Sequence, residues 1–335
     1  MRVSDLTILG TIQTMNDFTI LVLEGANSSS VAVTLDILAT AARLAPRHGL
    51  SLPKWRIYSA SGGTVELQGG ISIDTERLTR RGGSDKSVWV VPGLGLDKTS
   101  AIQHRLSKDD AKSAIAAIRK HALVGGTVAA SCSSVFLLQA AGVLKKKCVT
   151  TTWWLAQELQ RIETDCKVDA HRMVCDDGMV VTAGAAFAQS DLMLHLLRKL
   201  CGTVLVDAIS RVLLLDGREV QAPILVPEVF SNGDSLVGRL ATRIDSALPN
   251  VPKISELAQE YCMSERTLSR HIKKATGKST MALVQSVRQR RARALLTSSR
   301  MTVEQVAVAV GYQDSTALRR LMRRVAGANP SRFRP

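Results

Sequence analysis

The last hundred residues of the chain repeat one pattern of hydrophobic positions. In the first copy, Ile254, Leu257, Ala258 and Tyr261 follow the i, i+3, i+4, i+7 spacing of a buried helical face. A turn is expected at 262–264. Ser264 is then the expected N-cap of a second helix, running from Glu265 to about Ala275. This segment therefore predicts a helix, a tight turn and a second amphipathic helix.

The second copy begins 49 residues later. Val303, Val306, Ala307 and Val310 repeat the first helical face, Gly311 supplies the turn and Asp314 is the expected cap. The helix that follows buries Leu318, Leu321, Met322 and Val325 and carries arginines on its other side. A long helix, about 280–297, joins the copies. The pattern predicts an all-α domain with two helix-turn-helix units.

Short apolar strands alternate with amphipathic helices in the first two thirds of the chain. This alternation is typical of a parallel α/β sheet that is covered on both faces. Strands are predicted at 18–24, 55–59, 88–92 and 127–130, a hairpin at 65–73, a strand pair at 174–183, and helices at 31–44, 109–121, 134–141 and 190–200. We expect a leader at 1–17, an α/β domain at 18–221, a linker at 222–233 that contains two prolines, and the helical domain at 234–335.

The positive charge is concentrated in the predicted helical domain. Residues 236–335 contain 19 Lys and Arg against 6 Asp and Glu, a net charge of +13. The remaining residues hold 25 and 23, a net charge of only +2. A solvated surface accounts for one basic helix, but two copies with matching cores, caps and basic faces indicate a polyanionic partner, namely double-stranded DNA.

Composition excludes several other classes. No apolar stretch is long enough to span a membrane, and no secretory signal precedes the first strand, so we expect a cytoplasmic protein without membrane contact. The six cysteines form no C-x-x-C pair and no metal-ligand spacing. We therefore predict no disulfide, no metal site and no cofactor.

Cys132 lies where a predicted strand turns into a helix, among small neighbours that permit a sharp elbow. At such an elbow the helix N-terminus lowers a thiol pKa, and free backbone amides can receive an anion. The alternative is that Cys132 is a small buried apolar residue. With the turn at 90–95 and the segment 149–153, this elbow makes residues 18 to about 215 resemble the class I glutamine-amidotransferase-like family, which includes intracellular-protease-like proteins.

This resemblance implies a flavodoxin-like, doubly wound sheet and, in active members, a cysteine, a histidine and in some branches an acid. Thr152 stands at the histidine position and Ser30 at the acid position, so we predict no catalytic residues. His171 and His195 remain open as spatial partners, although His195 is expected to be a core or rim residue. The binding site is instead expected to hold a small carboxylate, through Ser30, Gly93, Leu94, Cys132, Ser133, Thr152 and Trp153.

Residues 234–335 resemble an AraC/XylS-type DNA-binding domain, most specifically in Gly311-Tyr312 and in the ending 329–334. The combination of domains resembles the GlxA-type group of transcription regulators over about 95 per cent of the chain. The resemblance implies that the base-reading residues are Arg266, Ser269, Arg270, Ser315, Thr316, Arg319 and Arg320. Lys274, Arg324 and other cations, including Arg288, Arg290 and Arg291, are expected to contact phosphates or to lie on a solvated face.

We therefore predict a homodimeric transcription regulator that binds promoter DNA and a small effector. The resemblance implies an amino-acid- or betaine-like effector, with RNA polymerase as a further candidate partner. Two alternatives stay open: a cysteine hydrolase or amidotransferase with a basic DNA-associating tail, and a redox sensor that uses Cys132. A third possibility for the elbow is a remnant pocket that serves only packing or dimerisation.

Overall fold

The chain divides into two compact units, residues 1–219 and 220–335, in the computed structural model. The structure describes residues 18–78, 86–170, 172–215, 236–276, 279–326 and 329, with no side chain described at 274–275 and 324–326. The predicted leader, the predicted linker, His171 and the 330–335 ending lie outside the described residues. The predicted domain limits at 221 and 234 therefore stay predictions.

The first unit is built on an eight-stranded sheet in the order β3-β4-β2-β1-β5-β6-β10-β9. Its inner strands β2, β1, β5, β6 and β10 are parallel neighbours, as predicted. The predicted hairpin at 65–73 and the predicted strand pair at 174–183 form the two edges, where β3 pairs antiparallel with β4 and β9 pairs antiparallel with β10. The bounds are β1 Phe18–Leu21, β2 Trp55–Ser59, β3 Gly63–Glu66, β4 Ser72–Arg77, β5 Val88–Val91, β6 Val128–Ser131, β9 Val174–Asp177 and β10 Val180–Ala183.

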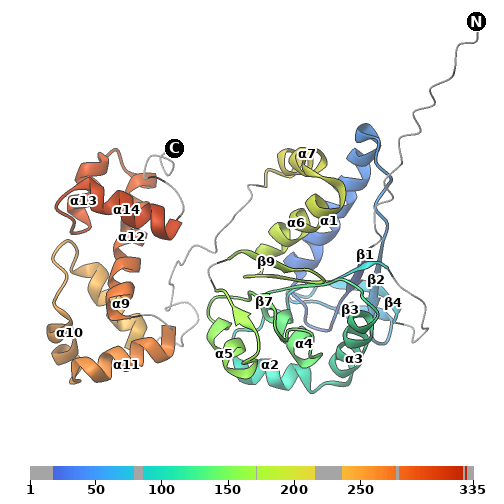
Figure 1. The fold of residues 1–335 in the computed structure, drawn as a ribbon, viewed down its shortest axis with the longest axis horizontal. Coiled ribbons are helices and arrows are strands. Elements are labelled where there is room, and N and C mark those ends of the chain that lie inside the picture. The colour runs from blue at the N-terminus through green and yellow to red at the C-terminus, as the bar shows by residue number, and fades with distance from the viewer. Residues whose placement is uncertain are drawn as a thin grey trace, which may run out of the picture. The chain divides into compact units, whose positions relative to one another are not determined.

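Helices cover both faces of this sheet (Figure 1). One face carries α1, α6 and α7, which pack against one another, and the other carries α2, α3 and α4. Helices α1, α3, α4 and α6 match predicted helices, whereas α2, α5, α7 and the short β7–β8 pair were not predicted. Their bounds are α1 Ser28–Leu44, α2 Thr99–Leu106, α3 Asp109–Leu123, α4 Val135–Ala140, α5 Ala156–Ile162, α6 Ala188–Cys201, α7 Thr203–Leu213, β7 Cys148–Val149 and β8 Lys167–Val168.

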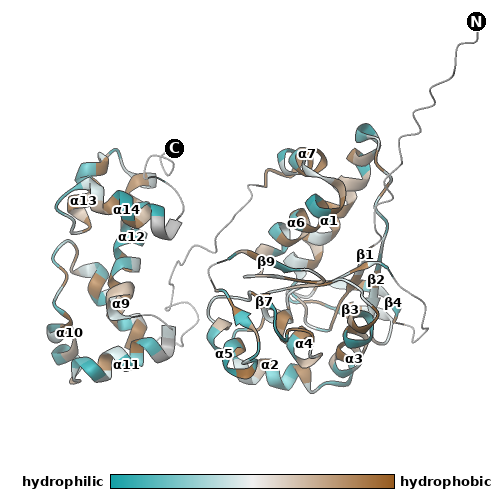
Figure 2. Cartoon of the chain, in the orientation of Figure 1, coloured by the Kyte–Doolittle hydropathy of each residue, from teal (hydrophilic) through white to brown (hydrophobic). Residues whose placement is uncertain are grey.

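The strands are apolar because both faces of the sheet are buried. The side chains of β1, β5, β6 and β10 are buried throughout. Such continuous apolar runs are typical of strands between two helical layers. In Figure 2 the strands at the centre of this unit are mostly brown, whereas the helices around them show teal on parts of their surface. This core fixes the strand ends, where the candidate site lies.

The second unit is entirely helical among its described residues. It contains α9 Leu236–Ser246, α10 Ile254–Glu260, α11 Glu265–Thr276, α12 Thr280–Ser298, α13 Val303–Ala309 and α14 Ser315–Ala326. The helix α12 runs between the α10–α11 pair and the α13–α14 pair (Figure 1). Both helix-turn-helix units and their connecting helix are thus confirmed, whereas α9 was not predicted.

Candidate functional site

The two helix-turn-helix units share a turn geometry. In each unit the second residue after the first helix adopts a left-handed conformation, Cys262 with φ 54° and Gly311 with φ 88°. The first helices α10 and α13 are offset by 49 residues, and the second helices α11 and α14 by 50. The second turn is therefore one residue longer than the first.

Capping side chains begin the second helix of each unit, as the sequence predicted. The Ser264 hydroxyl accepts a bond from the Thr267 N–H at 3.2 Å. A carboxylate oxygen of Asp314 accepts bonds from the N–H groups of Thr316 and Ala317, at 2.7 and 3.1 Å. These bonds satisfy amide groups that have no partner within the helix. The recognition helices α11 and α14 are therefore held at defined starting points.

The helix α9 connects the first helix-turn-helix unit to α12. Arg243 on α9 forms a bidentate ion pair with Glu260 of α10, with both bonds at 2.8 Å. Asp245 of the same helix lies 3.6 Å from Arg290 of α12. On the other side of α12, the Arg288 guanidinium lies 5.1 Å above the Tyr312 ring. Arg288 and Arg290 therefore have contacts within the helical domain, and their assignment as phosphate contacts or solvated face stays a prediction.

Exposed arginines occupy the outer sides of the recognition helices. Arg266 and Arg270 are exposed on α11, as Thr316, Arg319 and Arg320 are on α14. With the offset of 50 residues, Arg270 and Arg320 are structurally equivalent. Arginine can donate two hydrogen bonds to the O6 and N7 atoms of guanine in the major groove. This pair is thus the strongest base-reading candidate in the unit.

Other residues that the sequence assigned to base reading have protein partners. Ser269 is half-buried, and its hydroxyl lies 3.1 Å from that of Thr280 on α12, so its assignment to base reading stays a prediction. Glu304 of α13 lies 3.4 Å from Arg319 and accepts a bond from Ser315. Lys274 and Arg324 fall on helices, but their side chains lie outside the described residues.

The connecting helix sets the distance between the units. Its 19 residues span about 28 Å at 1.5 Å per residue. Successive major grooves on one face of DNA are about 34 Å apart. A helix of this length, with a recognition helix packed near each end, suits two adjacent grooves.

The sharp elbow after β6 is confirmed at Cys132. This residue adopts φ 55°, and its side chain is only 2% exposed. Its N–H donates to the Gly184 carbonyl at 2.7 Å, and its carbonyl accepts from the Thr151 hydroxyl at 2.7 Å. Gly93 lies so close that an added Cβ would stand 2.9 Å from the Cys132 Cβ and 3.4 Å from the Ser30 hydroxyl. The predicted residues Ser30, Gly93 and Cys132 are therefore brought together.

Of the two interpretations of Cys132, an activated thiol and a small buried residue, the burial of its side chain favours the second. Burial raises the pKa of Cys132 above its ordinary value, and the hydrogen bonds from Ser133 only partly oppose this effect. His195, which the sequence left open as a spatial partner but placed at the core or rim, lies 2.8 Å from the carboxylate of Asp176 on the edge strand β9, and Lys199 binds the same carboxylate. Burial therefore disfavours the thiolate form of Cys132, and the His195 ring is held by a hydrogen bond to Asp176.

Around the elbow, several polar side chains are completely buried. The hydroxyls of Ser131 and Thr152 have no hydrogen-bond partner among the described residues, whereas Ser30 donates to the Ala186 carbonyl at 3.2 Å. Leu94 is buried and Ser133 accepts a bond from the Leu96 N–H at 3.1 Å. Trp153 is half-buried and stacks edge-on against Trp154 with the ring centroids 5.2 Å apart. The prediction that these residues hold a ligand is untested by this geometry and stays a prediction.

The described part of the chain shows neither a metal site nor a helix suited to cross a membrane. No group of three or more His, Cys, Asp or Glu side chains is arranged to hold a metal ion there. No described helix combines the length and the apolar character that a membrane crossing requires.

Comparisons with known proteins agree with both units. Residues 97–199 match the DJ-1/PfpI family, and residues 257–335 match a helix-turn-helix domain. The HTH-type transcriptional regulator GlxA of Rhizobium meliloti is 25% identical over 80% of this chain and 82% of its own length. The HTH-type transcriptional regulator GbdR of Pseudomonas aeruginosa is 23% identical over 92% and 82%, respectively.

A solved structure confirms the fold of the α/β unit, residues 1–219. A ThiJ/PfpI family protein from Pseudomonas syringae superposes with a TM-score of 0.50 and 19% identity, over 64% of this chain and 82% of that chain. The chain thus joins a DJ-1/PfpI-type α/β domain to an AraC-type helix-turn-helix domain, the organisation of the HTH-type transcriptional regulators to which it is similar.

Proposed function

We propose that the protein is a sequence-specific transcription regulator whose helical unit reads promoter DNA and whose α/β unit binds a small effector and joins two copies. One observation carries the DNA-binding part. Two capped helix-turn-helix units, joined by one helix, expose equivalent arginines, Arg270 and Arg320, in a segment with a net charge of +13. This arrangement supports insertion of both recognition helices into successive major grooves.

The test is footprinting with the full chain on DNA selected from a random-sequence library and on its own promoter region. We expect protection of two half-sites about one helical turn apart. Arg270→Ala and Arg320→Ala are each expected to relax the preference at a different half-site, whereas Lys273→Ala, an exposed cation on α11, is expected to weaken all sequences alike. A full chain that gives no sequence-specific protection at moderate salt would contradict the regulator proposal.

In this proposal the elbow is not a catalytic site. The thiol has no base or carboxylate at Thr152 and Ser30, and burial raises its pKa, so a nucleophilic thiolate is scarce. We expect amidase, peptidase and glyoxalase rates equal to those of Cys132→Ala. A rate that disappears in Cys132→Ala would instead establish the cysteine hydrolase or amidotransferase alternative.

The redox-sensor alternative is tested by the same variant. Oxidants react with exposed thiolates, whereas Cys132 is buried and burial raises its pKa. We expect peroxide to leave DNA binding of the full chain unchanged. A peroxide response that is lost in Cys132→Ala would favour the sensor and contradict our proposal.

A further inference from the structure

Two cysteines that are distant in the sequence come together at one edge of the α/β unit. Cys148 lies on β7 and Cys175 on the edge strand β9, and a side-chain hydrogen bond links the two thiols. Both cysteines are free in the structure. A disulfide requires adjacent sulfurs and Cα atoms no more than about 7 Å apart, which strands packed side by side can provide. The fold therefore places two reduced thiols where a disulfide can form.

Hydrogen bonds on both sides of the cysteine pair fix β7 against β9. The Cys148 N–H donates to one carboxylate oxygen of Asp177 at 2.8 Å, and the Lys147 ammonium donates to the other at 3.1 Å. On the other side of the pair, the Thr150 hydroxyl donates to the Arg172 carbonyl at 3.1 Å. Because these bonds hold both strands in place, the sulfurs can be joined with little movement of the backbone.

The two thiols differ in exposure. Cys148 is half-buried, whereas Cys175 is only 1% exposed. Burial, and then the negative charge of a nearby Cys148 thiolate, raise the pKa of Cys175 to about 12. Oxidants react first with the more accessible sulfur. Cys148 is therefore the thiol that a small oxidant reaches, and Cys175 is the thiol that reacts second.

We propose that hydrogen peroxide converts Cys148 and Cys175 into a reversible disulfide. The Cys148 sulfur attacks the peroxide, the O–O bond breaks, and a sulfenic acid and one water form. The Cys175 sulfur then attacks the Cys148 sulfur, so that the S–S bond forms, the S–O bond breaks and a second water leaves with the Cys175 proton. Two thiols are thus oxidised while one peroxide is reduced to two waters, and a thiol reductant reverses the bond by exchange.

The disulfide joins two segments that hold the elbow after β6. Just after β7, the Thr151 hydroxyl donates to the Cys132 carbonyl at 2.7 Å. Just before β9, the Met173 carbonyl accepts from the Gly184 N–H at 2.9 Å, and the Gly184 carbonyl accepts the Cys132 N–H at 2.7 Å. Oxidation is therefore expected to restrict the backbone around the elbow, while Cys132 itself keeps its thiol.

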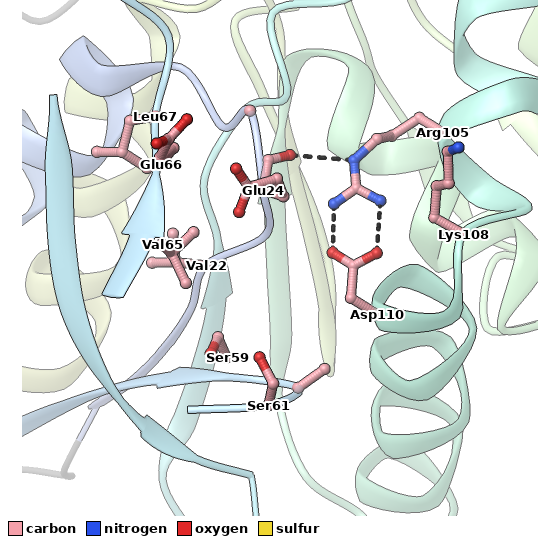
Figure 3. A pocket seen from close by; sticks show the side chains of 12 residues that line it. Val22, Glu24, Ser59, Ser61, Val65, Glu66, Leu67, Arg105, Lys108 and Asp110 are labelled. Carbon is pink, nitrogen blue, oxygen red and sulfur yellow. Dashed lines mark hydrogen bonds and ion pairs between the residues drawn. The ribbon is translucent and has the colours of Figure 1, made fainter. Parts of the chain in front are cut away.

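A cavity on another part of the sheet provides an internal reference. It has a volume of about 610 Å³ and lies beside the ends of β1 and β2, where Arg105 pairs with Asp110 (Figure 3). Strands β5, β6 and β10 separate β1 from β9, and none of the described residues that line the cavity is a cysteine. The disulfide is therefore expected to leave hydrogen exchange in the loop after β1 unchanged.

The test is oxidation of the folded full chain that carries Cys262→Ala, because the exposed Cys262 would otherwise link two chains. After treatment with hydrogen peroxide and alkylation of the remaining thiols, peptide mapping by mass spectrometry without reductant is expected to show one linkage, Cys148–Cys175. Dithiothreitol is expected to remove it. The bond should raise the melting temperature of the α/β unit by on the order of 5 °C and slow hydrogen exchange at 149–154.

Single variants separate the roles of the two thiols. Cys175→Ser is expected to form no disulfide and to leave a sulfenic acid at Cys148, which dimedone traps. Cys148→Ser is expected to leave Cys175 as an unmodified thiol. Cys201→Ser removes another half-buried cysteine and is the matched control, which is expected to form the same disulfide as the unchanged chain.

The inference is wrong if peroxide forms no disulfide in the folded chain, or if Cys148 pairs instead with Cys166, whose thiol also lies near it. A disulfide that leaves both the melting temperature and exchange at 149–154 unchanged would refute the restriction of the elbow. The inference does not rest on the proposed function, because it concerns residues of the α/β unit alone. Its failure would leave the footprint on DNA as a separate test of the regulator proposal.

Discussion

The two helix-turn-helix units place different residues at the same left-handed position of the turn. The first unit turns on Cys262 and the second on Gly311, both in the left-handed region. The Cys262 side chain points into solvent, whereas an added Cβ at Gly311 would stand 2.4 Å from the Pro249 carbonyl oxygen and 3.1 Å from Arg288. The first turn therefore only tolerates a strained conformation, while the second also needs the absence of a side chain. Equivalent positions in a repeat differ in what packs against them.

Among the variants that test this difference between the turns, Gly311→Ala is expected to have the largest effect on stability. A left-handed alanine costs about 1–2 kcal/mol, and the contact with the Pro249 carbonyl adds about 1–3 kcal/mol. We expect a loss of about 3 kcal/mol in the stability of the helical unit, measured by hydrogen exchange of α12 to α14 in the full chain. Cys262→Ala is the matched control, because it changes the side chain at the equivalent position and is expected to have little effect.

The second prediction compares DNA reading by the two units. Arg270→Ala and Arg320→Ala are each expected to cost about 1–3 kcal/mol in binding free energy to the selected DNA site. Each variant should relax the preference at the half-site that its own recognition helix contacts. Competition binding with singly mutated half-sites measures both effects. Equal loss at both half-sites in either variant would mean that the units do not read DNA independently.

The helical unit was largely predictable because its contacts are local in sequence. Ser264 and Asp314 cap helices within three residues of themselves, and the periodicity of the apolar positions marks the buried faces. The helix α9 was missed although Val237, Leu240, Ala241 and Ile244 carry the spacing of a buried face. That signal was present in the sequence. The structural roles of Arg288 and Arg290 were not visible, because their partners lie 24 and 45 residues away.

The elbow was predictable in its backbone but not in its chemistry. The strand, the turn at Cys132 and the helix after it follow from the local sequence. The burial of the thiol depends on a distant segment, since Gly184 accepts the Cys132 N–H and Ala186 accepts the Ser30 hydroxyl. Burial raises the thiol pKa, and the sequence alone left an activated and a buried cysteine as alternatives. Solvent exposure is a property of the whole fold, so local sequence cannot establish it.

A smaller effect is expected from Cys262→Gly, which makes the two turns alike. Glycine adopts the left-handed conformation without the cost that cysteine incurs there, about 1 kcal/mol. We expect a stabilisation of about 0.5–1 kcal/mol, seen as slower hydrogen exchange in α10 and α11 with no change in α13 and α14. Destabilisation by Cys262→Gly would mean that the cysteine side chain contributes contacts that outweigh its strain.

The helix caps Asp314 and Ser264 are expected to differ least in their effect on stability at neutral pH. Their difference appears only in acid. The N–H groups of Ala317 and Thr316 lower the pKa of Asp314 below its ordinary value, whereas the Ser264 hydroxyl does not titrate in this range. A lowered folded-state pKa means that this cap stabilises α14 above the unfolded pKa of about 3.9 and is lost as pH falls through the lower folded value.

Asp314→Asn keeps a capping side chain but removes its charge. We expect exchange in α14 to match that of the unchanged chain at neutral pH and to become less sensitive to acid below about pH 4, with α11 unaffected. Because Ser264 provides the equivalent cap without a charge, α11 of the unchanged chain is the internal reference. An acid response of α14 that persists in Asp314→Asn would assign the titration to another carboxylate of the second unit, of which Glu304 also has a lowered pKa.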